Sequence, residues 1–321
     1  MPTDEAISTH SMTEPGVAGY WPCGPGSYPE AVVVLAGVVL AGGQSSRMGT
    51  PKATLEWHGS TLLRRTAGIL ARATGGPVVV VRARGQELPD LPDEILIAED
   101  SRPGKGPVQG IAAGLAALRG RADAAFISST DMPFLHPAFV RRVLGVLAAN
   151  EDIDVALPVA RGYRQPLAAG YRVALADAAE RLVAADRLRP AFLLDDRTVE
   201  QLDEEALKQD PALAALDPDL ESVVNVNTPA DFQAARARPA PEVTVRLSGT
   251  LAEADGSGSP RVVRAATLGA AASAVGLVLG RPVAASLNGD QIARDGQTPV
   301  AAGDIVCFRP ADPRRLAGPA R

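Results

Sequence analysis

Short apolar stretches rich in β-branched residues alternate with longer segments of helical periodicity along most of the chain. The pattern predicts a strand at 37–41, a helix at 61–72 and a second strand at Val78–Val81. One face of this helix carries recurring buried-type residues, namely Leu62, Leu63, Thr66, Ile69 and Leu70. The alternation continues through three further strands and two helices, predicted at Glu94–Ala98, Ala124–Ser128, Asp154–Pro158, 108–119 and 137–149. It predicts an α/β fold with a mainly parallel sheet covered by helices on both faces.

A second pattern begins after Arg236–Pro241, a segment of Arg, Ala and Pro that is typical of a linker. Glu242–Leu247 alternates as a half-buried strand does, and Thr267–Leu279 is helix-like although two glycines interrupt it. Short strands are predicted at 283–288 and 304–308, which gives a small α+β outline of the ββαββ type. We therefore predict a leader at 1–33, a large domain at 34–238 and a small domain at 239–321.

The predicted leader is rich in Gly, Pro, Ser and Thr without sustained periodicity, as in a disordered segment or an over-extended start. The apolar run Ala31–Ala41 could be mistaken for the core of a signal peptide, but acidic residues and no Lys or Arg precede it. A membrane-spanning helix needs about 20 apolar residues, so the run is too short to cross a bilayer. We interpret it as a central strand.

Composition narrows the class of protein. A chain of 321 residues with 46% hydrophobic content is long enough for two cores. The net charge of −5 and the pI of about 5.4 argue against nucleic acid or an anionic membrane as the main partner. The two cysteines, Cys23 and Cys307, suggest neither a disulfide framework nor a zinc site, which favours the cytoplasm. The three histidines form no cluster in the sequence, and we expect no catalytic role for them.

A glycine-rich loop follows the first predicted strand. Residues 38–52 read Val-Val-Leu-Ala-Gly-Gly-Gln-Ser-Ser-Arg-Met-Gly-Thr-Pro-Lys. Gly42 and Gly43 let backbone N–H groups approach phosphate oxygens, while Arg47 and Lys52 supply positive charge. The spacing fits neither a Walker loop nor a dinucleotide-binding fingerprint. We interpret the loop as a cradle for a nucleoside triphosphate, at the sheet edge where such folds bind ligands.

Four further segments share a known pattern with this loop, in the same order along the chain: Glu99–Ile111, Ser129–Leu135, Arg164–Ala169 and Asn225–Asp231. Together the five segments resemble the molybdenum cofactor nucleotidyltransferases, specifically the guanylyltransferase branch, which attaches GMP from GTP to molybdopterin. The resemblance implies a Rossmann-like three-layer nucleotidyltransferase domain. It also implies an enzyme that releases pyrophosphate, with GTP and molybdopterin as its substrates.

The resemblance assigns catalysis to Lys52, Arg47 and Asp131. Lys52 would hold the α-phosphate, Arg47 would bind the β- and γ-phosphates, and Asp131 would hold Mg²⁺. Nucleotidyl transfer depends mainly on positioning and on stabilising charge, so a cation, two basic side chains and a carboxylate suit it. Mg²⁺ commonly takes one or two carboxylates beside substrate phosphates, which fits a lone Asp.

The remaining family positions divide between nucleotide and acceptor. The nucleotide site would comprise Leu40, Ala41, Gly42, Gly43, Lys52, Asp100 and Asp131, with Lys105 as a further phosphate contact and Gly106 and Gly110 for close backbone approach. Gln165, Asn225 and Asn227 would bind the molybdopterin side, because amides pair donors and acceptors as a pterin edge does. Molybdenum cofactor biosynthesis proteins or acceptor molybdoenzymes are further expected partners.

The choice of nucleotide depends on two segments. The cytidylyltransferase branch has Ala-Ala-Gly where this chain has Ala41-Gly42-Gly43, and an Asp-x-Asp-like segment where this chain has Asn225-Val226-Asn227. Both differences favour GTP, although an Asn common near Arg82 in guanylyltransferases is absent. A CTP-dependent cytidylyltransferase remains the nearest alternative. A sugar-phosphate nucleotidylyltransferase and a non-catalytic cofactor-binding chaperone are more distant ones.

The C-terminal segments 247–253, 287–290 and 302–310 resemble the ubiquitin-like β-grasp sulfur carriers of molybdopterin synthase. A working carrier needs a terminal Gly-Gly whose carboxylate becomes a thiocarboxylate, but this sequence ends Gly318-Pro319-Ala320-Arg321. We therefore expect a docking or pathway-coupling module rather than an active sulfur carrier.

Overall fold

The structure is a computed structural model, which describes residues 33–42, 49–100, 106–256, 259–280, 282–292 and 295–311. The predicted leader, apart from Val33, lies outside the described residues. The described part of Val33–Arg321 packs as one compact unit.

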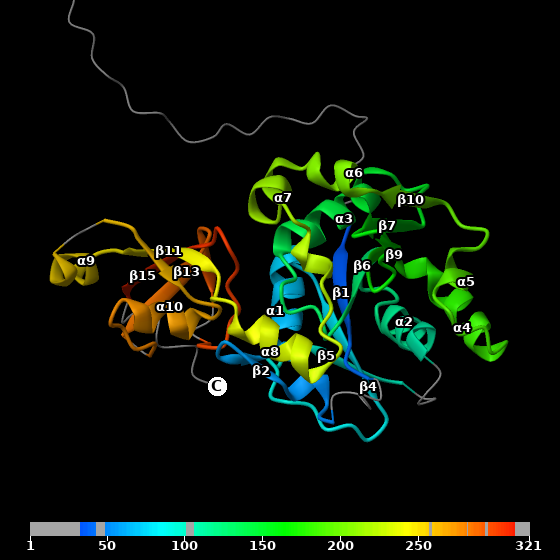
Figure 1. Ribbon diagram of the computed structural model, residues 1–321, viewed down its shortest axis with the longest axis horizontal. Helices are drawn as coiled ribbons and strands as arrows, with labels where there is room; N and C mark the ends of the chain where they lie inside the picture. Colours follow the sequence, from blue (N-terminus) through cyan, green and yellow to red (C-terminus); the bar gives the residue numbers. More distant parts are fainter. Residues whose placement is uncertain are drawn as a thin grey trace, which may run out of the picture. The chain divides into compact units, whose positions relative to one another are not determined.

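The larger sheet has eight strands (Figure 1): β1 Leu35–Leu40, β4 Val78–Ala83, β5 Leu96–Asp100, β6 Ala124–Ser129, β7 Val155–Ala160, β8 Tyr163–Arg164, β9 Ala168–Arg172 and β10 Val199–Leu202. Its order is β10-β7-β9-β6-β1-β4-β5, with β8 paired to β7. Four pairings are parallel, β1 with β4 and β6, β4 with β5, and β7 with β10, whereas β9 runs antiparallel to both β6 and β7. The predicted mainly parallel sheet is confirmed. The sequence pattern did not predict β8, β9 or β10.

The helices of this part are α1 Leu62–Thr74, α2 Gly106–Ala117, α3 Pro137–Ala149, α4 Ala176–Ala184, α5 Ala191–Leu194, α6 Glu204–Lys208, α7 Pro211–Leu216 and α8 Pro229–Ala237. Short 3-10 turns lie at η1 Lys52–Thr54, η2 Val173–Leu175 and η3 Glu221–Val223, and a small hairpin pairs β2 Glu56–Trp57 with β3 Ser60–Thr61. The linker expected at 236–241 is shorter than predicted, because α8 continues to Ala237. No helix among the described residues combines the length and apolar character that crossing a membrane requires.

Alternate residues of the central strands serve two cores, as the two-residue period of a strand dictates. Val39, Val80 and Phe126 pack in the core that includes α1 and α3. Val38 and Val81 point to the opposite face and pack in the core that includes α2 and α4. The sheet is therefore buried on both sides, as its continuous apolar strands predicted.

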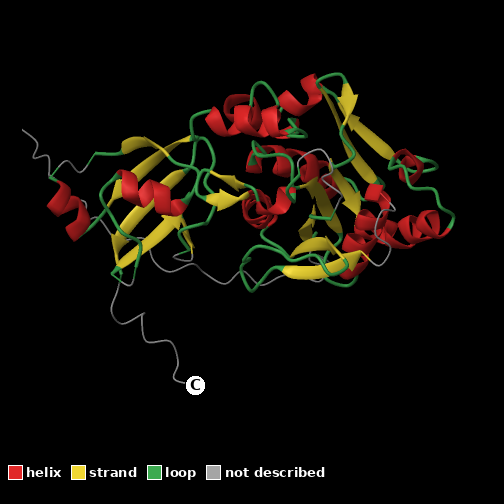
Figure 2. Ribbon diagram, turned by 60° about the horizontal axis from the view of Figure 1, so that its bottom comes forward, coloured by secondary structure: helices red, strands yellow, loops and turns green. Residues whose placement is uncertain are grey.

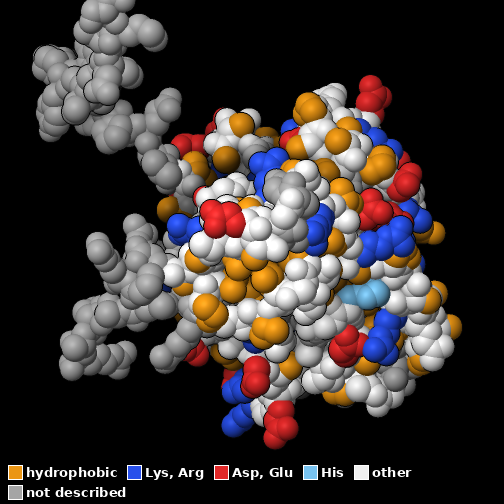
Figure 3. Space-filling view, turned by 90° about the vertical axis from the view of Figure 1, so that its left-hand side faces the viewer, with side chains coloured by type: hydrophobic (Ala, Val, Ile, Leu, Met, Phe, Trp, Pro, Cys, Tyr) orange, Lys and Arg blue, Asp and Glu red, His pale blue; other side chains and the backbone are white. Residues whose placement is uncertain are grey.

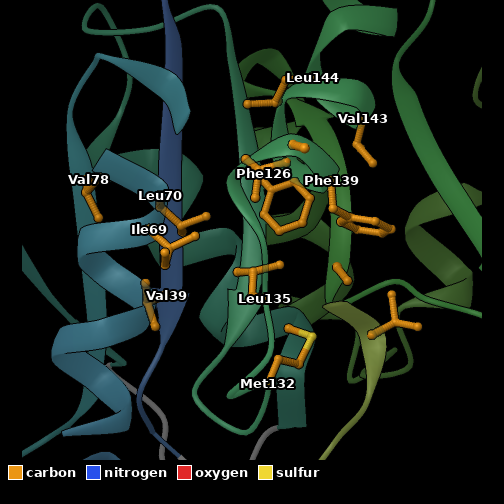
Figure 4. Packing of buried hydrophobic residues seen from close by; sticks show 14 of the residues in the cluster. Val39, Ile69, Leu70, Val78, Phe126, Met132, Leu135, Phe139, Val143 and Leu144 are labelled. Carbon is orange, nitrogen blue, oxygen red and sulfur yellow. The ribbon is translucent and has the colours of Figure 1, made fainter. Parts of the chain in front are cut away.

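Figure 4 shows the first of these cores. Ile69 and Leu70 of α1 lie against the sheet, and Phe139 of α3 lies beside Phe126 of β6. The two rings meet edge to face, with centroids 6.2 Å apart and planes at 88°. The predicted apolar face of α1 is confirmed, since all five of its residues are buried.

The C-terminal residues form a second sheet with its own core (Figure 2). Its strands are β11 Glu242–Leu247, β12 Arg261–Arg264, β13 Val283–Leu287, β14 Asp290–Ile292 and β15 Ile305–Pro310, in the order β12-β11-β15-β13-β14. Two helices accompany them, α9 Thr250–Asp255 and α10 Leu268–Ala274. We call residues 242–311 of this structure the C-terminal sheet unit.

The expected outline of the C-terminal sheet unit needs two corrections. The helix predicted at Thr267–Leu279 ends at Ala274, because Gly276 adopts a φ of +75° that continues no right-handed helix. The short elements α9, β12 and β14 were not predicted. Seen from the side of this unit, hydrophobic side chains gather on part of the surface among charged ones (Figure 3). Among the unit's described residues, the exposed large hydrophobic ones are Val262, Val278 and Ile305.

Candidate functional site

Three predicted site residues meet in the structure although they are far apart in the chain. Lys52 Nζ donates to Asp131 Oδ2 at 3.0 Å and to Asn227 Oδ1 at 2.8 Å. The side chains of Lys52 and Asp131 are each 17% exposed, so this ion pair is mostly shielded from solvent but still accessible. We call Lys52, Asp131 and Asn227 the lysine–carboxylate cluster.

Each member of the cluster stands next to an element that fixes its backbone. Lys52 is the first residue of η1, and its carbonyl accepts from Leu55 N at 3.2 Å. Asp131 follows the carboxyl end of β6, the buried strand beside β1. Asn227 lies just before α8, and Val226 N donates to the Asp131 carbonyl at 2.8 Å. The last two segments are therefore held together by their main chains.

A capping box orders the Asn227 side of the site. Thr228 Oγ1 accepts from Asp231 N at 3.1 Å, while Asp231 Oδ2 accepts from Thr228 N at 2.9 Å and from Asn227 N at 3.1 Å. The Thr228 hydroxyl and these two backbone N–H groups lower the pKa of the Asp231 carboxyl. The role of Asp231 is to cap α8, and its hydrogen bonds fix the turn that contains Asn227.

The predicted nucleotide-binding main chain lies at the carboxyl edge of β1. Leu40 ends this strand, and the N–H groups of Ala41 and Gly42 both donate to the Val81 carbonyl, at 2.8 and 3.2 Å. A Cβ on Gly42 would lie 3.1 Å from Ala83 N, so the loop turns tightly against β4. Gly43, Arg47 and Lys105 lie outside the described residues, and their expected roles stay predictions.

Asp100 is the last residue of β5, which runs parallel to β4 and thus ends at the same sheet edge as β1. Gly106 opens α2 with a φ of +71°, a conformation that favours glycine. A Cβ on Gly110 would lie 3.0 Å from Leu40 Cδ2, so this glycine brings α2 close to β1. The structure thus places Asp100 at the carboxyl edge of the sheet and packs Gly110 against β1, while their binding of a nucleotide stays a prediction.

Within the described part of the chain, no hydrogen bond joins the predicted acceptor residues Gln165 and Asn225 to the lysine–carboxylate cluster. Gln165 Nε2 donates to the Ala160 carbonyl at 3.1 Å, within the turn before β9. Since β9 is antiparallel to β6, with Ala168 opposite Ser128, this turn lies toward the edge that carries Asp131. Asn225 is exposed, one residue before the buried Val226.

Two residues without a predicted role support the site. Ser129 Oγ donates a short hydrogen bond to Asp131 Oδ1, so the last residue of β6 orients the carboxylate. Gln86 Nε2 donates to the Ala41 carbonyl at 3.0 Å, and its Oε1 accepts from Ala83 N at 3.0 Å. The Ser-x-Asp spacing offered a signal for Ser129, whereas no local pattern marked Gln86.

The residues of the cluster can take part in holding a divalent cation. Among the described residues there is no group of three or more His, Cys, Asp or Glu side chains arranged around one point. Asp131 thus offers a single carboxylate. The Asn227 amide oxygen lies nearby, because both groups accept hydrogen bonds from the Lys52 ammonium. Such a donor set fits a cation that obtains most of its ligands from water and substrate phosphates, as Mg²⁺ does.

Comparison with known proteins identifies the family of the chain. The family model described as "MobA-like NTP transferase domain" matches residues 37–203. The chain belongs to this family. The matched residues include Lys52, Asp131 and the glycine-rich loop, whereas Asn227 lies beyond them.

Relatives of the MobA-like chain carry specific names. It is 42% identical over 166 residues to the "Probable molybdenum cofactor guanylyltransferase" of Mycobacterium bovis strain BCG, covering 51% of this chain and 80% of that protein. It is 36% identical over 208 residues to the like-named protein of Mycobacterium avium, covering 64% and 96%. A solved structure of molybdopterin-guanine dinucleotide biosynthesis protein A from Archaeoglobus fulgidus is 24% identical, covers 63% of this chain and 96% of that one, and has a TM-score of 0.48.

Proposed function

We propose that the protein transfers GMP from GTP to molybdopterin, forming the guanine dinucleotide cofactor and releasing pyrophosphate. The observation that carries this proposal is the lysine–carboxylate cluster, which gathers an ammonium, a carboxylate and an amide at the end of β6. The names of the mycobacterial relatives support the choice of GTP and of molybdopterin as substrates.

The reaction joins two phosphates. An oxygen of the molybdopterin phosphate attacks the α-phosphorus of GTP, a new P–O bond forms, and the bond to the β-phosphate bridging oxygen breaks so that pyrophosphate leaves. Lys52 would leave part of its contact with Asp131 and donate to the α-phosphate oxygens as charge develops there. Asn227 would then orient the acceptor, since its Oδ1 already lies 2.8 Å from the same ammonium group.

Asp131 and the nucleotide phosphates would hold Mg²⁺. When bound, this cation neutralises phosphate charge and aligns the two reacting phosphates. Ser129 keeps the Asp131 carboxylate oriented for that task through its hydrogen bond to Oδ1. The roles of Arg47, Gly43 and Lys105 on the phosphates, of Asp100 with Leu40, Ala41 and Gly42 at the guanine nucleotide, and of Gln165 and Asn225 at the pterin are part of the same proposal.

For the C-terminal sheet unit we propose a β-grasp domain at 239–321, joined to a nucleotidyltransferase domain at 34–238. Numbered from its own first strand, the order β12-β11-β15-β13-β14 is 2-1-5-3-4, with its first and last strands parallel at the centre. This order and the packing of α10 in the core of the sheet support the proposal. We propose that this domain docks on the transferase, through contacts such as those of Arg65 with the Ala266 and Val300 carbonyls and of Arg72 with Asp304.

Incubating the full chain and Mg²⁺ with molybdopterin and one nucleoside triphosphate at a time tests the proposed reaction. Pyrophosphate release should be fastest with GTP and should require molybdopterin. A clear preference for CTP would instead make the protein a cytidylyltransferase. Cofactor delivery to an apo-enzyme without any pyrophosphate release would indicate a chaperone.

A further inference from the structure

A buried arginine, Arg65, binds the segment that follows Asp131 of the lysine–carboxylate cluster. Arg65 stands in the first turn of α1 and is 5% exposed. Its Nε donates to the Pro133 carbonyl at 2.8 Å, and its Nη1 lies 3.3 Å from both the Ala266 and the Val300 carbonyl oxygens. One guanidinium group thus links the segment after Asp131 to two segments of the C-terminal sheet unit.

The same guanidinium also touches the segment that follows Lys52. Its Cζ lies 4.4 Å from the ring centroid of Trp57, a residue of the β2–β3 hairpin that is 2% exposed. A cation–π contact of this kind is strongest when both groups are shielded from water, as Arg65 and Trp57 are here. Arg65 therefore contacts the chain on the carboxyl-terminal side of both Lys52 and Asp131.

An apolar cluster joins the same parts of the chain that Arg65 joins. It joins Trp57 and Leu62 to Val226, which precedes Asn227, and to Ala266 of the C-terminal sheet unit, and Phe134 packs against it. Trp57 and Phe134 meet edge to face with centroids 6.0 Å apart. Each member of the lysine–carboxylate cluster therefore has a residue close to it in sequence that packs in or against this apolar cluster: Trp57 for Lys52, Phe134 for Asp131 and Val226 for Asn227.

A second arginine of α1 binds the C-terminal sheet unit but not the site. Arg72 Nη2 makes two hydrogen bonds of 2.8 Å to the Asp304 carboxylate, and its Nη1 donates to the Pro299 carbonyl at 2.7 Å. Between the two arginines, a Cβ on Gly68 would come within 2.6 Å of Pro299, so the helix and this segment are in close contact. Arg72 therefore serves docking alone.

We propose that Arg65 is a positioning residue: it fixes the segments that follow Lys52 and Asp131 relative to each other. Because its guanidinium is itself held by the C-terminal sheet unit, the relative position of Lys52 and Asp131 depends on that unit being docked. This inference rests on the proposed nucleotidyl transfer. The C-terminal sheet unit then contributes to catalysis without contacting substrate, through the Ala266 and Val300 carbonyls that fix the guanidinium.

The test compares Arg65→Met with Arg72→Met in the full chain, because both substitutions remove an α1 arginine that binds the C-terminal sheet unit. Circular dichroism first establishes the temperature below which each variant is folded. We expect Arg65→Met to lower kcat by about 10- to 100-fold with little change in the KM for GTP, since small misplacements of reacting groups cost rates of this order. Arg72→Met should keep the kcat of the wild type.

A second measurement does not depend on the reaction. The sequence has three lysines, Lys52, Lys105 and Lys208, so ¹³C-lysine labelling gives a simple spectrum in which a Lys52→Met sample identifies the Lys52 signal. Arg65→Met should move this signal, whereas Arg72→Met should leave it in place. Lys208, which pairs with Glu204 within α6, is the internal reference.

If folded Arg65→Met keeps the wild-type kcat and the wild-type Lys52 signal, the proposal is wrong. It is also wrong if Arg72→Met changes kcat and the Lys52 signal as much as Arg65→Met does. If Arg65→Met does not fold, Arg65→Lys decides, because its ammonium cannot reach all three carbonyls; wild-type kcat and Lys52 signal in that variant would also refute the role. If the wild type transfers no GMP, the proposed function fails, and the Lys52 signal alone decides whether Arg65 positions the cluster.

Discussion

At the scale of single residues, the site depends on how a few side chains share their hydrogen bonds. One carboxylate oxygen of Asp131 accepts a hydrogen bond from Lys52 and the other accepts one from Ser129. The Lys52 ammonium donates to both Asp131 and Asn227. The sequence alone indicated Lys52, Asp131 and Asn227, because each lies in a segment with a recognisable pattern. It could not indicate Gln86, whose contact with Ala41 arises only from the pairing of β1 and β4.

Asp131→Asn tests the proposed cation site. The substitution keeps the shape of the side chain but removes its charge, so the rate of GMP transfer should fall by about 100- to 1000-fold, as when one electrostatic contact to the reacting groups is removed. The Mg²⁺ concentration for half-maximal rate should also rise. Asp219→Asn, at an exposed position, is the matched control and should leave both values unchanged.

His136 makes stability depend on pH. Its Nδ1 accepts from Ala138 N at 3.1 Å, so the proton lies on Nε2, which faces the Ala302 carbonyl at 3.0 Å. Burial lowers the pKa of His136, and of the less buried His58, below the usual value of 6.5. The unfolded chain therefore binds more protons than the native one, and stability that is complete above about pH 6.5 decreases as the pH falls below it.

The urea midpoint measured from pH 8 to pH 5 checks this sign. It should stay level at first and then drop below pH 6.5, and His136→Asn, which can still cap α3, should weaken the drop. A midpoint that rises on acidification would contradict the assignment of a neutral, buried His136.

At the scale of elements, the pattern of apolar residues predicted those strands and helices that lie in the repeating β-α-β part. β11 and α3 were predicted with the bounds that the structure has, because capping residues and alternation agree there. β9 was missed because it inserts antiparallel between β6 and β7, and nothing local in Ala168–Arg172 distinguishes such a strand from a loop. Long-range pairing, rather than propensity, makes it a strand.

Two helical glycines give opposite predictions. A Cβ on Gly114 of α2 would lie 2.4 Å from Val38 Cγ1, whereas nothing lies within 4 Å of a Cβ on Gly145, an exposed position of α3. Gly114→Ala should therefore destabilise the fold by about 1–3 kcal/mol through overpacking. Gly145→Ala should stabilise it by about 0.5–1 kcal/mol, because Ala is the better helix former. Urea unfolding measures both, and equal effects would contradict the packing of α2 on β1.

At the scale of the whole molecule, arginines of α1 join the large sheet's part of the chain to the C-terminal sheet unit. The sequence favoured two domains because composition and periodicity change near residue 239. It did not predict that the buried Arg65 and the half-buried Arg72 would bind the C-terminal sheet unit, since charged residues on a helix are usually solvated. Their partners in the C-terminal sheet unit are carbonyls and a carboxylate more than 200 residues later, which no local pattern reveals.

Asp304→Ala tests this docking. The Asp304 side chain is 7% exposed and also accepts from Asn288 Nδ2 at 2.8 Å and from Ala301 N at 2.7 Å. Its removal leaves Arg72 without its ion pair in a poorly solvated position, which should cost about 3–5 kcal/mol of unfolding free energy. Glu242→Ala, which removes an exposed pair with Arg264, should cost less than about 1 kcal/mol. Similar losses for the two variants would contradict the buried docking contact.

The most direct test of the account follows the α-phosphate of GTP. With α-labelled GTP, Mg²⁺ and molybdopterin, the wild-type chain and Lys208→Met should both transfer label into the guanine dinucleotide cofactor, whereas Lys52→Met, folded by circular dichroism, should transfer almost none. Transfer by Lys52→Met at the wild-type rate would contradict the central claim that the lysine–carboxylate cluster performs the reaction.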